Sequence, residues 1–298
     1  MVDSVLGESL PSLLERTRRG GCDVRGCETA HSAATTYIAL SRCMRRIPRP
    51  LRRVADALLW ALLPGHCLMC DQASERRADL CDACSDALPW IDRACVRCAL
   101  PSDASYCADC QRRPPPFERA IAPLEYADAT IAMVHRLKFG GSRIDARVLG
   151  TLLAARVRTA YADAPLPDVI VPVPLGRARL LRRGHNQAAL LARWVGAALA
   201  VPIDYVSCAR IRHTTPQAGL SRAARLHNLA GAFEVVGSFA ERRVGIVDDV
   251  MTTGSTVAAV ARALRVAGAA SIDVWCAART VPASHSDVRA RGIDHRDC

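Results

Sequence analysis

From residue 117 onward, short apolar runs alternate with longer stretches whose apolar residues recur every three or four positions. The short runs predict buried strands, and the three-to-four spacing predicts amphipathic helices. The predicted strands are Ala120–Tyr126, Val169–Val173, Ile203–Val206, Ala232–Val236, Val244–Val247 and Ile272–Cys276. The predicted helices are Ala129–Phe139, Ala146–Tyr161, Asn186–Ala200 and Ser255–Ala267. This alternation indicates an α/β fold, with a mostly parallel sheet and helices on both faces.

The earlier part of the chain has a different pattern. Its residues 51–63 have apolar positions at helical spacing, whereas its cysteine-rich stretch has no long apolar face and cannot build a core alone. A short stiff spacer of three prolines, Pro114–Pro116, precedes the α/β part. The expected parts are an extension at 1–45 that is disordered or does not belong to the protein (with Met44 as an alternative start), a basic amphipathic helix at 46–65, a cysteine-rich domain at 66–113, the α/β domain at 117–281 and a polar tail at 282–298.

Composition excludes several classes of protein. The 298 residues are 50% hydrophobic and 23% charged, too long and too apolar for a disordered tail or a disulfide mini-protein. Forty basic residues against 29 acidic ones give a net charge of +11, which suits phosphate esters or nucleic acid without choosing between them. Six arginines between Arg42 and Arg53 are read as a solvated helix face, with a nucleic-acid or anionic-surface patch as the alternative.

The expected compartment follows from three acidic residues near the N-terminus. Asp3, Glu8 and Glu15 precede any apolar core, which argues against a secretory signal peptide. No run of 18 apolar residues is present, so we expect no membrane span. We therefore expect a cytoplasmic protein, whose cysteines are not disulfide-bonded.

Eight of the fourteen cysteines form four Cys-x-x-Cys pairs, with 10, 10 and 8 residues between consecutive pairs. The pairs are Cys67/Cys70, Cys81/Cys84, Cys95/Cys98 and Cys107/Cys110. Two intervening residues let both thiolates of a pair face one tetrahedral metal, and two pairs complete a four-cysteine site. We expect two structural zinc sites rather than disulfides, a redox relay or an iron–sulfur cluster. We favour sequential assignment, with the first two pairs on one zinc; an interleaved assignment stays open.

The segment VGIVDDVMTTGST at Val244–Thr256 is the most specific in the chain. An apolar strand leads into the adjacent acids Asp248 and Asp249, and a turn rich in hydroxyl groups precedes a helix that begins near Ser255. Backbone N–H groups and hydroxyls at a helix N-terminus bind a phosphate monoester. Carboxylates just upstream can accept hydrogen bonds from sugar hydroxyls. Helix capping alone would need one hydroxyl, so we favour a phosphate site.

This segment resembles the loop of type I phosphoribosyltransferases that binds 5-phosphoribosyl-1-diphosphate (PRPP). From about Pro64 to Val281, the chain resembles the ComF-type family, which includes competence protein F and GntX-like proteins. The stretches that carry the resemblance are the cysteine pairs, HRLKFGG at 135–141, VPVPL at 171–175, RRGHNQ at 182–187, TPQAGLSRAARLHNL at 215–229 and VWCAART at 274–280. The chain departs from the pattern at His185, where we expect an aromatic residue in many relatives.

The resemblance implies a type I phosphoribosyltransferase domain of Rossmann-like topology behind a small double zinc ribbon. It implies that Asp248 and Asp249 contact the ribose hydroxyls and form the catalytic centre. The implied PRPP site comprises Val247, Asp248, Asp249, Met251, Thr252, Thr253, Gly254, Ser255 and Thr256. The implied diphosphate side, with a closing flap over Thr214–Arg225, comprises Lys138, Pro172, Val173, Pro174, Arg182, Arg183, Gln217 and Arg225.

Two functions are compatible with this reading. One is phosphoribosyl transfer through an oxocarbenium-like sugar, with Mg²⁺ stabilising the diphosphate leaving group. The other is a PRPP-binding accessory factor without turnover, which binds single-stranded DNA through its phosphates and works with DNA-uptake proteins. The family's association with DNA uptake and use is compatible with both. A purely structural zinc adaptor would not explain Asp248–Thr256.

Overall fold

The computed structural model describes residues 65–74, 79–212 and 231–282. Its main sheet is parallel, with the strand order β3, β9, β8, β5, and β4 also pairs with β9. The strands are β3 (Arg119–Ile121), β4 (Leu124–Glu125), β5 (Val169–Pro172), β8 (Arg243–Met251) and β9 (Ser271–Arg279). The predicted α/β fold with a parallel sheet is therefore confirmed.

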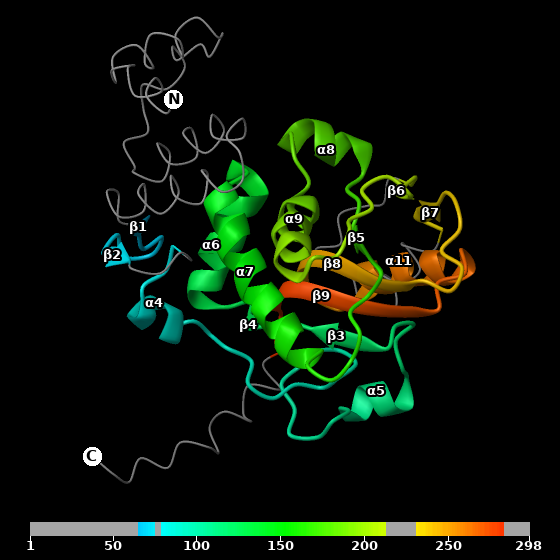
Figure 1. The fold of residues 1–298 in the computed structure, drawn as a ribbon, viewed down its shortest axis with the longest axis horizontal. Coiled ribbons are helices and arrows are strands. Elements are labelled where there is room, and N and C mark those ends of the chain that lie inside the picture. Colours follow the sequence, from blue (N-terminus) through cyan, green and yellow to red (C-terminus); the bar gives the residue numbers. More distant parts are fainter. Residues whose placement is uncertain (1–64, 75–78, 213–230, 283–298) are drawn as a thin grey trace, which may run out of the picture. The chain divides into compact units, whose positions relative to one another are not determined.

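Helices cover both faces of this sheet, with α7 and α9 in front of the strands and α11 behind them in Figure 1. The helices are α6 (Asp128–Gly140), α7 (Arg143–Ala160), α9 (Gln187–Leu199) and α11 (Ser255–Val266). Successive side chains of a strand point to opposite faces. Two clusters of buried apolar residues lie on the two faces of the sheet. Ile246 of β8 packs in the cluster that includes residues of α11, and Val247 packs in the cluster that includes residues of α6, α7 and α9.

Local capping interactions set the helix ends near the site. The Ser142 side chain accepts a hydrogen bond from the N–H of Asp145 and caps α7, and the Asn186 side chain accepts one from Ala188 and caps α9. Gly141 ends α6 with φ +61°, a backbone conformation that glycine adopts at little cost.

The strand predicted at 120–126 is instead broken into β3 and β4. Pro123 lies between them and has no N–H to donate to β9, and its carbonyl oxygen accepts a hydrogen bond from Ile91. The sequence analysis predicted no element between the strand at 169–173 and the helix at 186–200, whereas residues Arg177–Arg183 form the short helix α8. None of the residues of α8 is buried, so the sequence has no apolar periodicity there that would predict a helix.

The predicted strand at 203–206 was wrong, apart from one bridge between Ile203 and Ile170. The Asp204 carboxylate accepts hydrogen bonds from the N–H groups of Val206 and Ser207, which holds the backbone in a turn. The strand of this region begins later. It is β6 (Cys208–Arg210), which pairs antiparallel with β7 (Phe233–Val235).

The cysteine-rich segment is held by the α/β part, as its lack of a core predicts. Its elements are β1 (Gly65–His66), β2 (Ala73–Ser74), α4 (Asp82–Asp86) and α5 (Ala108–Arg112). Leu80 and Leu88 belong to the cluster of α6, α7 and α9, whereas Ile91 belongs to the cluster of α11. The buried carboxylate of Asp79 pairs with Arg147 of α7. Packing and a buried ion pair thus attach the segment to the sheet domain.

Some expectations lie outside the described residues: those for 1–45, for the helix at 46–65 up to residue 64, for the flap with Gln217 and Arg225, and for the tail from 283 onward. Across 65–74, 79–212 and 231–282, every helix is too short or too polar to traverse a lipid bilayer.

Candidate functional site

The two adjacent acids lie within β8 rather than after it. The prediction ended this strand at Val247, but β8 continues to Met251, which pairs with Arg279 of β9. Both residues lie within the strand, close to its carboxyl end. The Asp248 carboxyl lies near enough to that of Asp249 for the two to interact directly.

Asp249 faces α6 and is 5% exposed. Its Oδ2 lies 3.1 Å from Nζ of Lys138, and its Oδ1 accepts a hydrogen bond of 2.8 Å from the N–H of Val250. The half-buried Arg183 of α8 also feels the charge of Asp249: burial lowers the pKa of Arg183, and Asp249 opposes that lowering. Asp249 thus lies beside two cations.

Asp248 feels the charges of two cations, Arg210 of β6 and Lys138 of α6. Its Oδ1 accepts a hydrogen bond of 2.9 Å from the N–H of Asp249. Burial, together with the negative charge of Asp249, raises the pKa of Asp248 well above its usual range. Arg210 in turn packs over Gly176 at the start of α8. A ligand hydroxyl or a cation could therefore stabilise the Asp248 carboxylate here.

The turn after β8 has the geometry of an anion site. Gly254 has φ +75°, and a Cβ there would lie 3.0 Å from Cε of Met251, so the turn requires glycine. Within the described part of the chain, the N–H groups of Thr253, Gly254 and Thr256 have no hydrogen-bond acceptor. They lie at the N-terminus of the twelve-residue helix α11. Unpaired N–H groups at the positive end of a helix attract a phosphate.

Side chains of the same turn hold one another. The hydroxyl of Ser255, which is buried, lies 2.8 Å from that of Thr253. Thr252 is exposed, whereas Met251 is buried below the turn. Of the residues predicted to bind PRPP here, Val247 has a fully buried side chain that packs in the core.

A buried arginine that the sequence reading did not include supports this turn from below. Arg279, at the end of β9, is 5% exposed. Its Nη1 donates to the carbonyl oxygens of Met251 at 2.8 Å, Thr280 at 2.7 Å and Thr252. Its Nε donates to the carbonyl oxygen of Cys98, over 2.8 Å. A charged residue at the end of the apolar run VWCAA was the available signal, because buried arginines almost always have partners.

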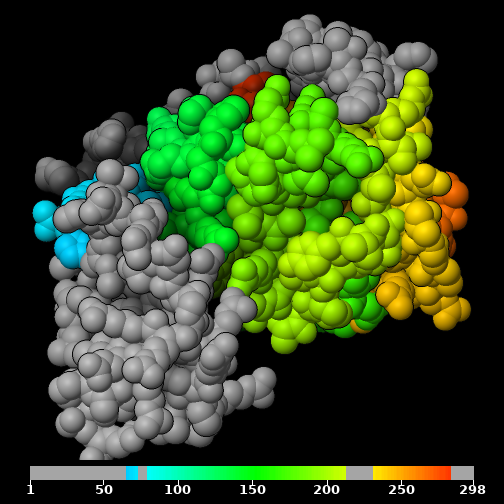
Figure 2. All heavy atoms as spheres, turned by 90° about the horizontal axis from the view of Figure 1, so that it is seen from above, coloured from blue at the N-terminus to red at the C-terminus, as the bar shows by residue number. Residues whose placement is uncertain are grey.

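The carboxyl end of β5 lies next to β8, close to the acid pair. A diphosphate-binding loop after β5 requires this proximity. The N–H of Val173 donates to the carbonyl oxygen of Val247, and the Asn186 side chain donates to the carbonyl oxygen of Val173. Pro172 is the last residue of β5, and Pro174 lies in the turn before α8. Arg182 is exposed on α8, which lies at the surface beside the green atoms of α6 and α7 in Figure 2.

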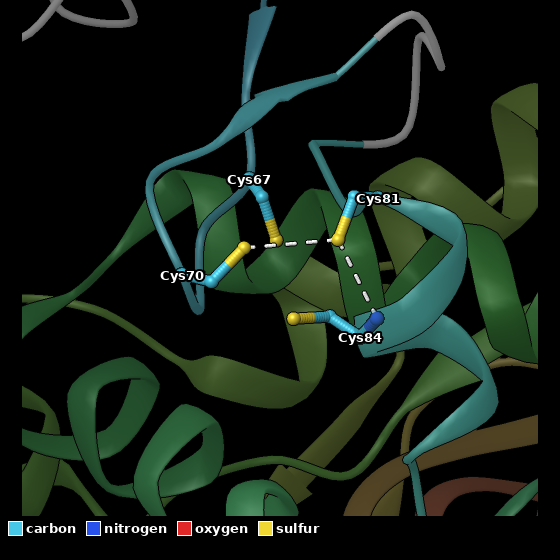
Figure 3. A group of neighbouring side chains, drawn as sticks. All are labelled: Cys67, Cys70, Cys81 and Cys84. Atoms are coloured by element: carbon cyan, nitrogen blue, oxygen red, sulfur yellow. Dashed lines mark hydrogen bonds between the residues drawn. The ribbon is translucent and has the colours of Figure 1, made fainter.

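The four sulfurs of Cys67, Cys70, Cys81 and Cys84 face one common space (Figure 3). They come from the turn after β1 and from the start of α4. The four lie within 4.8 Å of one another, and Cys70 Sγ lies 3.7 Å from Cys81 Sγ. Tetrahedral zinc with bonds of about 2.3 Å places its sulfurs about 3.8 Å apart, so this group fits a zinc ion.

Cys95, Cys98, Cys107 and Cys110 form the second such group, with Cys98 Sγ 3.7 Å from Cys107 Sγ. The assignment is thus sequential, as favoured from the spacing. Although burial raises the pKa of Cys67 and Cys95, backbone N–H groups lower it to about 6 and about 7 respectively. Hydrogen bonds of this kind prepare thiolates for a metal.

Two families match the chain by sequence. Residues 58–111 match the double zinc ribbon domain, and residues 146–293 match the phosphoribosyl transferase domain. A purine phosphoribosyltransferase from Pyrococcus horikoshii has a similar structure, with 23% identity and a TM-score of 0.28 over 45% of this chain and 73% of that one.

Relatives match over most of their length. The DNA utilization protein YhgH of Escherichia coli K12 is 37% identical over 224 residues, which cover 74% of this chain and 99% of the relative. Competence protein F of Haemophilus influenzae is 35% identical over 207 residues, which cover 67% and 90% respectively. Together with the two groups of four cysteines and the parallel sheet, these matches show that the chain belongs to the competence protein F family, in which a double zinc ribbon precedes a phosphoribosyltransferase domain.

Proposed function

We propose that this protein binds PRPP, or a related ribose phosphate, with Mg²⁺ at the end of β8 and the start of α11. One observation carries the proposal: the unpaired N–H groups of Thr253, Gly254 and Thr256 follow two carboxylates by a few residues. The amides would hold the 5-phosphate, and the carboxylates would accept hydrogen bonds from the ribose hydroxyls. Arg183 and Arg210 would balance the charge of the diphosphate.

Mg²⁺ fits the donors that this site would offer. The ion prefers oxygen ligands and keeps several waters, so one carboxylate and the oxygens of the ligand suffice. The pKa of Asp248 is raised, and a cation bound beside it would lower that pKa and stabilise the charged carboxylate. When bound, Mg²⁺ would stabilise the negative charge of the diphosphate as a leaving group.

If the protein catalyses transfer, its own residues act by position and charge. Backbone amides and the acid pair would hold the sugar so that C1 faces its acceptor, which supplies the entropic part of catalysis. The arginines beside α8 would stabilise charge that develops on the departing diphosphate. We propose no side-chain nucleophile, because phosphoribosyl transfer does not require one.

Titration calorimetry with PRPP and Mg²⁺ tests the binding proposal. The double variant Asp248→Asn/Asp249→Asn keeps size and polarity but removes two charges. Charge-assisted hydrogen bonds contribute roughly 1.5–3 kcal/mol each, so we expect affinity to fall at least tenfold. Asp168→Asn is the matched control, because Asp168 pairs with Arg243 at the opposite end of β8. Equal binding by wild type and double variant would contradict the proposed site.

A diphosphate-release assay separates enzyme from binding protein. We expect wild type to release diphosphate from PRPP and Mg²⁺ in the presence of its acceptor, and the double variant to release none. Tight PRPP binding without release across a panel of candidate acceptors would favour an accessory factor without turnover.

Single-stranded DNA is the second candidate ligand, favoured by an open pocket of about 570 Å³ beside the second group of cysteines. Three arginines line it, Arg97, Arg262 and Arg265, together with the proline run Pro114–Pro116. The guanidinium of Arg97 lies 5.0 Å from the ring centre of Tyr106, which is 41% exposed. Arginine and aromatic side chains at one place suit phosphates and bases of a single strand.

The test is the salt dependence of oligo(dT) binding, followed by fluorescence anisotropy. We expect Arg97→Gln/Arg262→Gln to weaken binding and to reduce the slope of log affinity against log salt by about 1–2. The control Arg143→Gln/Arg193→Gln removes the same charge from exposed positions on α7 and α9. Binding that is equally weakened in both double variants would point to net charge alone.

A further inference from the structure

Lys138 is the only lysine among the 40 basic residues of the chain, and it lies in the last turn of α6. Its Nζ lies 3.1 Å from Oδ2 of Asp249, and the two side chains are 24% and 7% exposed. The same ammonium lies 5.9 Å from the centre of the Tyr126 ring. Ions that are largely shielded from water are screened weakly, so this attraction directs the Asp249 carboxylate strongly.

The end of α6 is held in place by His185. Its Nε2 lies 2.8 Å from the carbonyl oxygen of Leu137, and its Nδ1 lies 2.8 Å from that of Arg183. A Cβ on Gly141 would lie 3.2 Å from the same ring. His185 thus fastens the turn that carries Lys138 to the end of α8, which gives the HRLKFGG and RRGHNQ stretches a shared structural role.

A second contact joins the same two helix ends. The guanidinium carbon of Arg183 lies 5.3 Å from the ring centre of Phe139, the residue after Lys138. These contacts fix the backbone of the last turn of α6, so the side chain of Lys138 begins from a fixed place beside Asp249. A flexible lysine side chain is ordinarily a poor positioning group, and a fixed backbone reduces that disadvantage.

We propose that Lys138 is a positioning residue for the ribose part of the site, which acts by holding the carboxylate of Asp249 and does not contact the diphosphate. This inference rests on the proposed function. It differs from the expectation that Lys138 belongs to the diphosphate side, and the two roles make different predictions.

Ribose 5-phosphate distinguishes them, because it has the sugar and the 5-phosphate of PRPP but no diphosphate. If Lys138 acts through Asp249, then Lys138→Met weakens both ligands by the same factor. If Lys138 contacts the diphosphate, the substitution weakens PRPP and leaves ribose 5-phosphate unchanged.

Titration calorimetry with both ligands, in Mg²⁺ and on the full chain, is the experiment. We expect Lys138→Met to lower both affinities about tenfold, and Lys138→Arg to stay within about threefold of wild type because it keeps the charge. In an Asp249→Asn background, Lys138→Met should change either affinity less than about twofold, because the group through which Lys138 acts is already neutral.

Arg143→Met is the matched control, since it removes one cation from an exposed position at the start of α7. It should leave both affinities unchanged. If Lys138→Met does not fold, as judged by its melting temperature and zinc content, Lys138→Gln replaces it with the same expectations.

Two results would overturn the positioning role: a loss confined to PRPP, or losses from Lys138→Met and Asp249→Asn that simply add. If Lys138→Met binds both ligands as tightly as wild type does, the positioning role is also refuted, whereas the proposed function is not. Wild-type protein that binds neither ligand would instead refute the proposed function, and the inference with it.

Discussion

Nε of Arg279 donates a hydrogen bond of 2.8 Å to the carbonyl oxygen of Cys98, and so joins the end of β9 to the second cysteine group. The same guanidinium holds the carbonyl oxygens of Met251 and Thr252, just before the candidate phosphate turn. One buried side chain therefore contacts both the metal-binding segment and the base of the turn. Its positive charge lies beneath the place where a phosphate is expected.

Replacement of Arg279 by methionine should therefore lower both stability and PRPP affinity. Each buried carbonyl left without a donor costs about 1–3 kcal/mol, and the turn loses its support. Differential scanning fluorimetry and calorimetry measure the two effects. Arg265→Met is the control, because Arg265 also donates to two carbonyl oxygens, those of Ala269 and Ala270, but far along α11 from the turn. Equal ligand affinity in Arg279→Met and wild type would refute the supporting role.

Purified protein should contain two zinc ions per chain, measured by elemental analysis. Cys67→Ser and Cys95→Ser should each reduce the content to about one and lower solubility, because the metal's binding energy, about 10–16 kcal/mol for such a site, is folding energy. Cys208→Ser is the control, since this buried thiol lies outside both groups. Soluble, folded protein with almost no metal would contradict two structural zinc sites.

Asp248→Asn should raise the melting temperature near neutral pH. Because the pKa of Asp248 is raised in the folded state, this carboxyl destabilises the fold once pH exceeds its unfolded pKa of about 3.9. The gain from asparagine should therefore grow between about pH 5 and pH 8. Melting temperatures of both proteins across this range test it, and a loss of stability at pH 8 would contradict it.

In the control for that experiment, the substitution should change the melting temperature in the opposite direction. Arg243 donates a hydrogen bond to Asp168 and lowers its pKa to about 2. A lowered pKa contributes stability above the unfolded value, and that stability is lost as pH falls towards 2. Asp168→Asn should therefore lower the melting temperature at neutral pH, slightly because the pair is exposed.

Gly141→Ala should destabilise the fold by about 1–2 kcal/mol, measured by urea unfolding, because alanine is strained at φ +61° and its Cβ would press on His185. Gly140→Ala is a neighbouring control, since a Cβ there meets nothing within 4 Å. Similar unfolding free energies for the two variants would show that the contact with His185 is loose.

Features with a local physical cause were readable in the sequence. Side-chain periodicity predicted α6, α7, α9 and α11, because a helix that covers a sheet must be apolar on one face. The Cys-x-x-Cys spacing predicted both metal groups, because two intervening residues already bring two sulfurs to one side of a turn. The segment Val244–Thr256 predicted an anion site, because glycine and the helix start place N–H groups within a few residues of each other.

Features that join distant parts of the chain were not readable. The pairing of Met251 with Arg279 extends β8 past Val247, and that extension places Asp248 and Asp249 inside the strand rather than after it. Hydrogen bonding between strands decides where a strand ends, and the partner strand is absent from any local window. For the same reason β6, which pairs with the correctly predicted β7, formed at Cys208–Arg210 and not at the predicted 203–206.

The sequence by itself determined the kinds of groups present: paired thiolates that fit zinc, and the amides and carboxylates that we propose bind a ribose phosphate. Only the tertiary structure decided which groups the supporting cations contact. Lys138 pairs with Asp249, and Arg279 donates hydrogen bonds to the carbonyl oxygens of Cys98 and Met251. The reason is that a buried charge must find its partner wherever packing brings one within about 3 Å, and that partner can lie anywhere along the chain.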